Sequence, residues 1–155
     1  MLDINDDDEK KLKNLSSKRL VPLHPVLVDE LKLPDYAKSL RSNGHTRLFP
    51  NLKQQRDGYS QTVSKWFGRY RVRCGVDSPK KTFHSFRHTF ITAMKHKVVN
   101  ISILHELHGH ALEGMTMARY GKKYPPRVLY DEAVSKLEYP LDWGHLKGGQ
   151  WVMKR

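Results

Sequence analysis

The sequence contains one cysteine and no long apolar run. Because Cys74 is alone, the 155-residue chain can form no internal disulfide and has no Cys-rich zinc motif, which suits a reducing compartment. No stretch approaches the roughly 18 consecutive apolar residues of a membrane span. The N-terminal "MLDINDDDEKK" also lacks the basic start and apolar core of a signal peptide. We therefore expect a cytoplasmic protein with one domain over residues 1–155, and Cys74 as a small core residue.

Acidic residues are scarce beyond the first nine positions. Five of the 16 acidic residues lie in the acidic stretch 1–9, which holds no Lys or Arg. The rest of the chain has 28 basic and 11 acidic residues, so its net charge is +17 against +12 for the whole chain. Each phosphate that Lys or Arg neutralises releases counterions, so this excess favours a polyanionic partner such as duplex DNA. The alternative is a basic protein whose charges only keep it soluble.

The pattern of apolar residues predicts a mainly α-helical chain with a small β-hairpin near the N-terminus, an α+β class. Residues 18–25 form a β-rich run that Pro22 and Pro25 end, and this indicates the second strand of a hairpin. The predicted helices span residues 25–33, 34–44, 60–75, 85–97, 100–109 and 126–138. A tail for which the pattern predicts no element follows the last helix, so residues 126–155 are expected to form a C-terminal helix and tail.

Capping residues and apolar stripes support the central helices. Ser60 and Asn100 are the expected N-caps, and Gly44, Gly75 and Gly109 are the expected ends. The expected stripes are Val63, Trp66, Phe67 and Tyr70 in one helix, Phe86, Phe90, Ala93 and Met94 in the next, and Val128, Leu129, Ala133, Val134 and Leu137 in the last.

Basic residues cluster on and after the helix predicted over residues 60–75. A basic helix face is often only a solvated one. Here the number of cations favours DNA contact over that alternative. The predicted DNA-binding residues are Lys65, Arg69, Arg71, Arg73, Lys80 and Lys81, together with Arg119 and Lys122 further along the chain.

Five of the nine histidines lie between residues 84 and 110, so a metal site has to be considered. A helical metalloprotease pair needs H-E-x-x-H. In "HSFRH" the permanent cation Arg87 stands between the two imidazoles, and "HELHG" has Gly109 where a second ligand should be. Since an arginine repels a metal ion, we predict no metal site.

A phosphate site fits the same residues better. The guanidinium of Arg87 can bond two phosphate oxygens at once, and His84, three residues earlier on the same helix flank, can donate another hydrogen bond or transfer a proton. Alone, H-x-x-R is a weak signal, because polar helix surfaces often contain it. His110 follows Arg87 by 23 residues in "LHGH", and Tyr120 follows ten residues later in "MARYGKKY".

This ordered set, with "KNLSSKRLVPLHP" upstream, closely resembles the catalytic domain of the tyrosine recombinases, in particular the phage and genomic-island integrases. The resemblance runs from about Lys11 to Lys123. It implies DNA cleavage and rejoining through a 3′-phosphotyrosyl intermediate, with neither ATP nor metal. It also implies self-association on DNA as a tetrameric synapse.

The resemblance assigns a role to five residues. Tyr120 matches the nucleophile, Arg87 the second arginine of the catalytic set, and His84 the histidine of H-x-x-R. His110 matches a further phosphate donor, and Lys13 the general acid for the departing 5′-oxygen. Alternatives remain for two of them: Lys10, Lys11 or Lys18 in place of Lys13, and Tyr124 in place of Tyr120.

One element of the resemblance is missing. The first catalytic arginine belongs to an L-R-x-x-E-like element before the hairpin, and this chain has no R-x-x-E. We therefore expect a catalytic-domain fold truncated at its N-terminal side, a fragment of a longer integrase that binds DNA and cleaves it weakly or not at all.

The competing functions are a non-catalytic DNA-binding module, a type IB topoisomerase and a metal-dependent hydrolase. Whether the last helix packs on its own domain or on a neighbouring protomer stays open.

Overall fold

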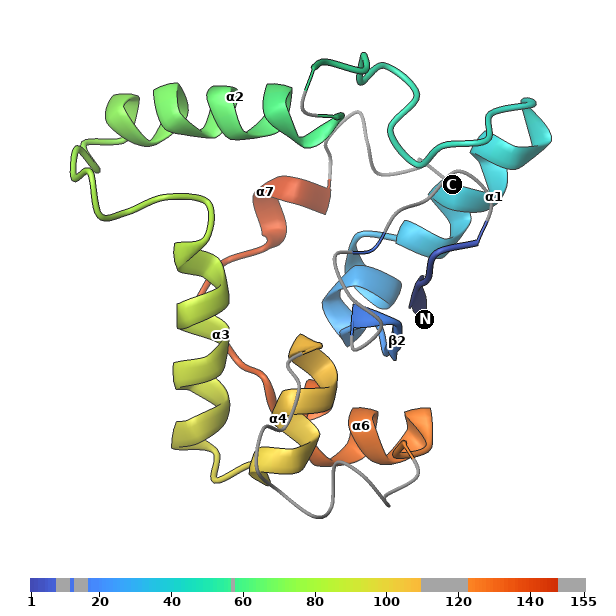
Figure 1. Cartoon of the computed structure of the whole chain (residues 1–155), viewed down its shortest axis with the longest axis vertical. Helices are drawn as coiled ribbons and strands as arrows, with labels where there is room; N and C mark the ends of the chain where they lie inside the picture. Colours follow the sequence, from blue (N-terminus) through green and yellow to red (C-terminus); the bar gives the residue numbers. More distant parts are fainter. Residues whose placement is uncertain (8–11, 13–16, 57, 110–122, 148–155) are drawn as a thin grey trace. The chain divides into compact units, whose positions relative to one another are not determined.

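The computed structural model describes residues 1–7, 12, 17–56, 58–109 and 123–147. Within these ranges most regular structure is helical, and the strands form one two-stranded antiparallel sheet near the N-terminus (Figure 1). The predicted mainly α class with a small hairpin is therefore confirmed. No helix in the described ranges combines the length and the apolar character that a membrane crossing requires.

The hairpin consists of β1 (Leu2–Ile4) and β2 (Arg19–Val21). Leu2 pairs with Val21, Asp3 with Leu20 and Ile4 with Arg19. Pro22 follows β2 directly, and because proline has no N–H it cannot extend the ladder. The strand predicted from residues 18–25 thus forms within its expected range.

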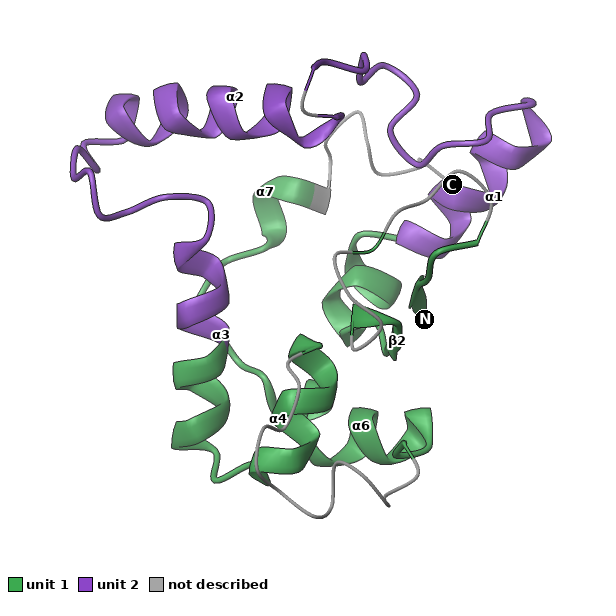
Figure 2. Ribbon diagram, in the orientation of Figure 1, with its two compact units in different colours: residues 1–32, 91–154 green, residues 33–90, 155 purple. Residues whose placement is uncertain are grey.

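The chain divides into two compact units (Figure 2). Unit 1 contains Met1–Lys32 and Ile91–Lys154, and unit 2 contains Leu33–Phe90. One helix, α3 (Ser85–His96), begins in unit 2 and ends in unit 1. The prediction of one domain over residues 1–155 stays a prediction.

Unit 1 is built from the hairpin, η2 (Val26–Glu30), the second half of α3, α4 (Ile101–His108), α6 (Pro126–Glu132), η3 (Val134–Lys136) and α7 (Gly144–Lys147). The residues 25–33 predicted as an α-helix contain η2, which is a π-helix of five residues. The buried apolar side chains are Met94, Ile103, Leu104, Leu107, Leu129, Ala133 and Val134. All of them belong to unit 1, so the core lies between α3, α4, α6 and η3.

The caps of α4 agree with the sequence. Asn100 accepts the N–H of Ser102 at 2.8 Å, and Gly109 ends the helix at a φ of 67°, in the left-handed region. The last predicted helix, in contrast, does not run unbroken from residue 126 to 138. It stops at Glu132, because Ala133 leaves helical geometry with φ −136° and ψ −67° while remaining fully buried. Ala133 and Val134 are both buried where the helix breaks.

Unit 2 contains α1 (Leu33–Ser42), α2 (Ser60–Arg73) and the first residues of α3. None of its described residues is buried. The apolar stripe expected in α2 is consequently wrong as a core: Trp66 is 51% exposed and Tyr70 47% exposed. Their rings stack on each other with centroids 5.0 Å apart. Ser60 is not an N-cap either, since the cap position is Tyr59, which makes no capping bond.

The C-terminal end of α2 is fixed by a backbone motif. The N–H of Gly75 donates to Val72 O at 3.0 Å and the N–H of Val76 to Arg71 O at 2.9 Å, the Schellman pattern. Gly75 has a φ of 74°, which confirms the predicted stop. Cys74, next to it, is exposed, and the expectation of a core cysteine is wrong because the end of α2 lies at the surface of unit 2.

Candidate functional site

His84 and Arg87 lie at the N-terminal end of α3. The turn before the helix is held by the N–H of Thr82, which donates to Ser85 Oγ at 3.0 Å, and by the N–H of Arg87, which donates to His84 O at 3.0 Å. The ring of His84 meets the ring of His88 edge-on, with centroids 5.2 Å apart. His84 and His88 are exposed and Arg87 is half-buried. The first turn of α3 holds no acidic residue, so this helix end suits an anion.

Three phenylalanines hold this end of α3 against α2. Phe67 of α2 lies 5.3 Å from both Phe83 and Phe86, and these two lie 5.5 Å from each other, all between ring centroids. Phe83 and Phe86 flank His84 in the chain, and Phe86 directly precedes Arg87. The aromatic cluster therefore holds the H-x-x-R segment next to α2.

The stripe predicted for α3 is only partly buried. Met94 is fully buried, while Phe90 and Ala93 are half-buried and Phe86 is 58% exposed. The expectation of a buried Phe86 is wrong because its end of α3 belongs to unit 2, where no described residue is buried. Aromatic contacts take the place of core packing there.

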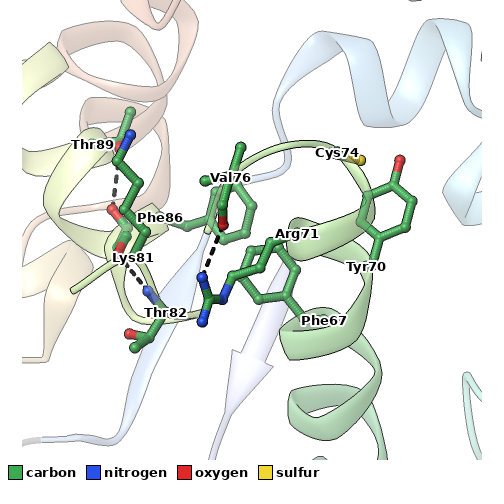
Figure 3. Close-up of a pocket in the computed structure, with 10 residues that line it drawn as sticks. Phe67, Tyr70, Arg71, Cys74, Val76, Lys81, Thr82, Phe86 and Thr89 are labelled. Carbon is green, nitrogen blue, oxygen red and sulfur yellow. Dashed lines mark hydrogen bonds between the residues drawn. The ribbon is translucent and has the colours of Figure 1, made fainter. Parts of the chain in front are cut away.

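A pocket of about 410 Å³ opens between α2 and the start of α3 (Figure 3). Its lining is mostly apolar and includes neither His84 nor Arg87. The lining residues are Phe67, Tyr70, Arg71, Cys74, Val76, Lys81, Thr82, Ser85, Phe86 and Thr89. His84 lines a separate cavity of about 360 Å³, which it shares with Arg71, Ser64 and Thr82 among others. His84 is also exposed to solvent.

The predicted DNA-binding residues of unit 2 divide into two kinds. Lys65, Arg69 and Arg73 are exposed on α2, and at helical spacing they share an arc with Trp66 and Tyr70; Lys80 and Lys81 are exposed in the following loop. Arg71 lies on the opposite side and donates from Nη1 to Val76 O at 2.8 Å (Figure 3). The same Nη1 also donates to Ser78 O at 2.9 Å. These bonds secure the turn after α2, so they give Arg71 a structural role.

In unit 1, the end of α4 is tied to β2. Arg19 Nε donates to Leu107 O at 3.0 Å, and its Nη1 donates to Ser17 O at 2.7 Å. A Cβ on Gly109 would lie 2.5 Å from Arg19 Nη1. The chain therefore leaves α4, one residue before His110, in direct contact with Arg19.

The chain returns to the same region after residue 122. Lys123 Nζ donates to Lys18 O, and the N–H of Tyr124 donates to Glu106 Oε2 at 3.0 Å. Sequence reasoning missed Arg19 and Glu106. The one signal in the sequence is that the apolar run "LVP" is directly preceded by a cation, Arg19, at the start of the strand.

Lys18 is one of the alternatives to Lys13 as general acid. Its Nζ lies 3.0 Å from Asp6 Oδ1 and 3.4 Å from Asp7 Oδ1. The hydrogen bond to Asp6, helped by the charges of both carboxylates, raises the pKa of Lys18 above its usual range. An ammonium with a raised pKa is a weaker acid, so this environment disfavours Lys18 for the role.

The other predicted site residues, Lys13, His110, Tyr120, Arg119 and Lys122, lie outside the described residues. The convergence of Lys13, His84, Arg87, His110 and Tyr120 on one phosphate therefore stays a prediction. In the part of the chain that the structure describes, no group of three or more His, Cys, Asp or Glu side chains is arranged to hold a metal ion.

The chain is similar in sequence to known proteins. A protein named tyrosine recombinase from Pseudothermotoga lettingae is 34% identical over 95 residues, which is 60% of this chain and 30% of that protein. The chain thus spans about 30% of the length of this relative. No solved structure matches the chain. Residues 9–126, a range that contains all five predicted catalytic residues, match the model of the phage integrase family, so the chain belongs to this family.

Proposed function

We propose that this chain carries most of the active site of a site-specific DNA recombinase, with Tyr120 as the nucleophile. The observation that carries the proposal is the order and spacing of His84, Arg87, His110 and Tyr120 inside the range matched by the family model. The exposed His84 and half-buried Arg87 at an acid-free helix N-terminus support it, because that environment suits a phosphate.

In the proposed reaction the phenol oxygen of Tyr120 attacks the scissile phosphorus and the bond to the 5′-oxygen breaks. The phenolic proton passes to His84, and Lys13 donates a proton to the departing 5′-oxygen. Arg87 and His110 stabilise the charge that develops on the non-bridging oxygens. A second 5′-hydroxyl then attacks the phosphotyrosyl ester, which restores a phosphodiester and frees Tyr120. The number of phosphate esters is conserved, so the step requires no ATP, cofactor or metal.

The exposed arc of α2 is the proposed DNA surface in unit 2. It presents Lys65, Arg69 and Arg73 beside the stacked Trp66 and Tyr70, and Lys80 and Lys81 follow in the loop. Lysine and arginine neutralise phosphates, and exposed aromatic rings can pack on sugars or bases. Arg119 and Lys122 are proposed to add contacts near Tyr120, and self-association into a tetramer on DNA is proposed as well.

Cleavage by this chain is proposed to be weak. It contains no R-x-x-E, the element that carries the first catalytic arginine in the resemblance. Loss of one donor to transition-state charge lowers rates by about 10²- to 10³-fold. The same observation favours a second candidate, a non-catalytic DNA-binding module that shares the basic surface of α2.

A covalent-adduct experiment tests the proposed nucleophile. The chain is incubated with a pool of duplexes whose sequence around the scissile phosphate is randomised. Each duplex carries a nick close to that phosphate, so that the short leaving strand diffuses away after cleavage. Adduct is then measured on a denaturing gel. We expect slow adduct formation that Tyr120→Phe abolishes, while Tyr124→Phe, the matched loss of a neighbouring phenol oxygen, preserves it. Adduct that survives Tyr120→Phe but not Tyr124→Phe would assign the nucleophile to Tyr124. No adduct from any sequence in the pool would favour the DNA-binding module.

A salt titration tests the DNA surface. The double variant Arg69→Gln/Arg73→Gln removes two exposed cations of α2. The matched control, Arg127→Gln/Lys136→Gln, removes two cations that are in ion pairs with Asp131 and Glu132 in unit 1. We expect the slope of log K against log salt, measured by anisotropy with a random duplex, to shrink by about 0.9 for each phosphate that the double variant no longer neutralises. Equal slopes for the two variants would remove α2 from the interface.

A further inference from the structure

The strongest unassigned feature of unit 1 is the set of contacts that Arg19 makes at the end of α4. The last four carbonyls of a helix have no partner within the helix, and a cation near them is favourable. Arg19 supplies both a donor and a charge: its Nε bonds Leu107 O at 3.0 Å, and its Nη1 bonds Ser17 O at 2.7 Å. The side chain is half-buried. One residue therefore joins β2 to the final turn of α4.

Gly109 makes this junction tight. Its φ of 67° is a conformation that favours glycine, and a Cβ there would meet Arg19 Nη1 at 2.5 Å, Arg19 Cζ at 3.0 Å and Ser17 Cα at 3.3 Å. Any side chain at residue 109 would push Arg19 or Ser17 away. The residue that precedes His110 in the chain is thus in contact with both Ser17 and Arg19.

The return of the chain is anchored at the same place. Lys123 Nζ donates to Lys18 O, and the N–H of Tyr124 donates to Glu106 Oε2 at 3.0 Å, one residue before the Leu107 carbonyl that Arg19 bonds. The residues on either side of segment 110–122, which are Gly109, Lys123 and Tyr124, therefore contact residues 17–19 or the last turn of α4. Ser17 also directly follows segment 13–16, which begins with Lys13.

We propose that Arg19 is a positioning residue for strand cleavage. It holds β2 against the last turn of α4, next to the residues that flank the segments carrying Lys13, His110 and Tyr120. This inference rests on the proposed function, because it takes these three residues as catalytic. Arg19 itself touches neither DNA nor the reacting atoms in this proposal. Its effect is geometric, and a displacement of about 1 Å at a reacting group can lower a rate by about 10²-fold.

The kinetic test compares Arg19→Gln and Arg19→Lys with the unmodified chain on the pool of nicked duplexes. We expect Arg19→Gln to lower the single-turnover rate of adduct formation by about 10²-fold while the Kd for DNA changes less than about twofold. Arg19→Lys keeps the charge and one donor and should recover part of the rate. The matched control is Arg127→Gln, which removes an exposed arginine of unit 1 that bonds Asp131, and it should leave the rate unchanged. Equal losses of rate and affinity, or unchanged rates, would overturn the proposal.

Amide hydrogen exchange separates this inference from the proposed function. Arg19→Gln should speed exchange at Gly109 and Tyr124 by about tenfold or more, the loss expected when one charge-assisted anchor is removed, and leave the buried Leu129 unchanged. Unchanged exchange at Gly109 and Tyr124 overturns the role of Arg19 whatever the activity. If the unmodified chain forms no adduct but exchange responds as expected, the proposed chemistry fails and the anchoring by Arg19 stands. Arg19→Lys serves as the second variant for both measurements if Arg19→Gln does not fold.

Discussion

Lys18, one residue before β2, pairs with the acidic N-terminal stretch. Its ammonium lies within hydrogen-bonding distance of two carboxylates, 3.0 Å from Asp6 and 3.4 Å from Asp7. All three side chains are exposed, so salt screens the pairing and its stability contribution is small. Its chemical effect is on protonation: the hydrogen bond from Lys18 lowers the pKa of Asp6 and, reciprocally, raises the pKa of Lys18.

The sign of this linkage gives a pH prediction. Because the pKa of Asp6 is lowered in the folded chain, the pairing stabilises above the unfolded pKa and is lost as pH falls through the folded value. For Lys18, with a raised pKa, the contribution is present below the unfolded pKa and is lost as pH rises through the folded one. An NMR titration of the Asp6 carboxyl should show its midpoint move upward in Lys18→Met. Lys136→Met, which removes a lysine paired with Glu132, is the control and should leave Asp6 unmoved. An unmoved midpoint in Lys18→Met would contradict the pairing.

At single residues, the sequence predicted local backbone capping better than it predicted side-chain burial. The expected helix capping by Asn100 and Gly109 depends on local backbone bonds, and it is confirmed. Whether Cys74 or Trp66 is buried depends on what packs over it, and both are exposed. Arg71 resembles its basic neighbours in sequence. Only the fold of the following turn brings the carbonyls of Val76 and Ser78 within reach of its guanidinium.

Among the elements, α3 ends in an unusual way. The N–H of Val98 donates to Lys95 O at 3.0 Å and the N–H of Val99 to Met94 O at 3.1 Å, so the helix closes with a Schellman motif. The left-handed position of this motif is normally glycine. Here it is Val98, a β-branched residue with a φ of 55° and a side chain that is 89% exposed. The side chain gains no packing in return for the strained backbone.

Replacing Val98 should therefore stabilise the chain. A left-handed conformation costs a residue with a Cβ about 1–2 kcal/mol. Glycine loses part of this gain through its greater unfolded-state entropy. We expect Val98→Gly to raise the free energy of unfolding by about 1 kcal/mol in urea titrations followed by circular dichroism. Val98→Ala keeps a Cβ at the same φ and should gain little. Destabilisation by Val98→Gly would show that the valine side chain makes contacts that offset the strain.

Element positions are largely readable from sequence, while element breaks are not. The second strand of the hairpin and the helices α2, α3 and α4 lie close to their predicted ranges, because prolines, glycines and caps act locally. The last helix is predicted to reach residue 138 but ends at Glu132. Ala133 is fully buried at this break, and burial by other elements is something that periodicity within one segment does not report.

On the scale of the whole chain, the buried apolar core and the exposed cations of α2 belong to different units. Every buried apolar residue of the described ranges belongs to unit 1, where α4 and α6 supply Ile103, Leu104, Leu107 and Leu129. Unit 2 has no buried described residue and instead presents the basic and aromatic arc of α2. His84 and Arg87 lie at the end of α3 that belongs to unit 2. The predicted phosphate-binding segment is thus carried by the less buried part of the chain.

This division predicts the pattern of hydrogen exchange. Helices with few buried apolar contacts open at lower free energy than helices of the core. We expect the amides of α4 and the first turns of α6 to exchange slowest, and those of α2 to exchange faster by at least about tenfold. Addition of a random duplex should slow exchange in α2, as the proposed DNA surface requires, and leave α6 unchanged. Mass spectrometry of peptides covering residues 60–73, 101–108 and 126–132 measures both effects. Equal protection of α2 and α4 without DNA would show that unit 2 gains its stability from contacts other than burial within it. If DNA slowed amide exchange in the peptides of both α2 and α6, the result would point instead to stabilisation of the entire chain by the duplex.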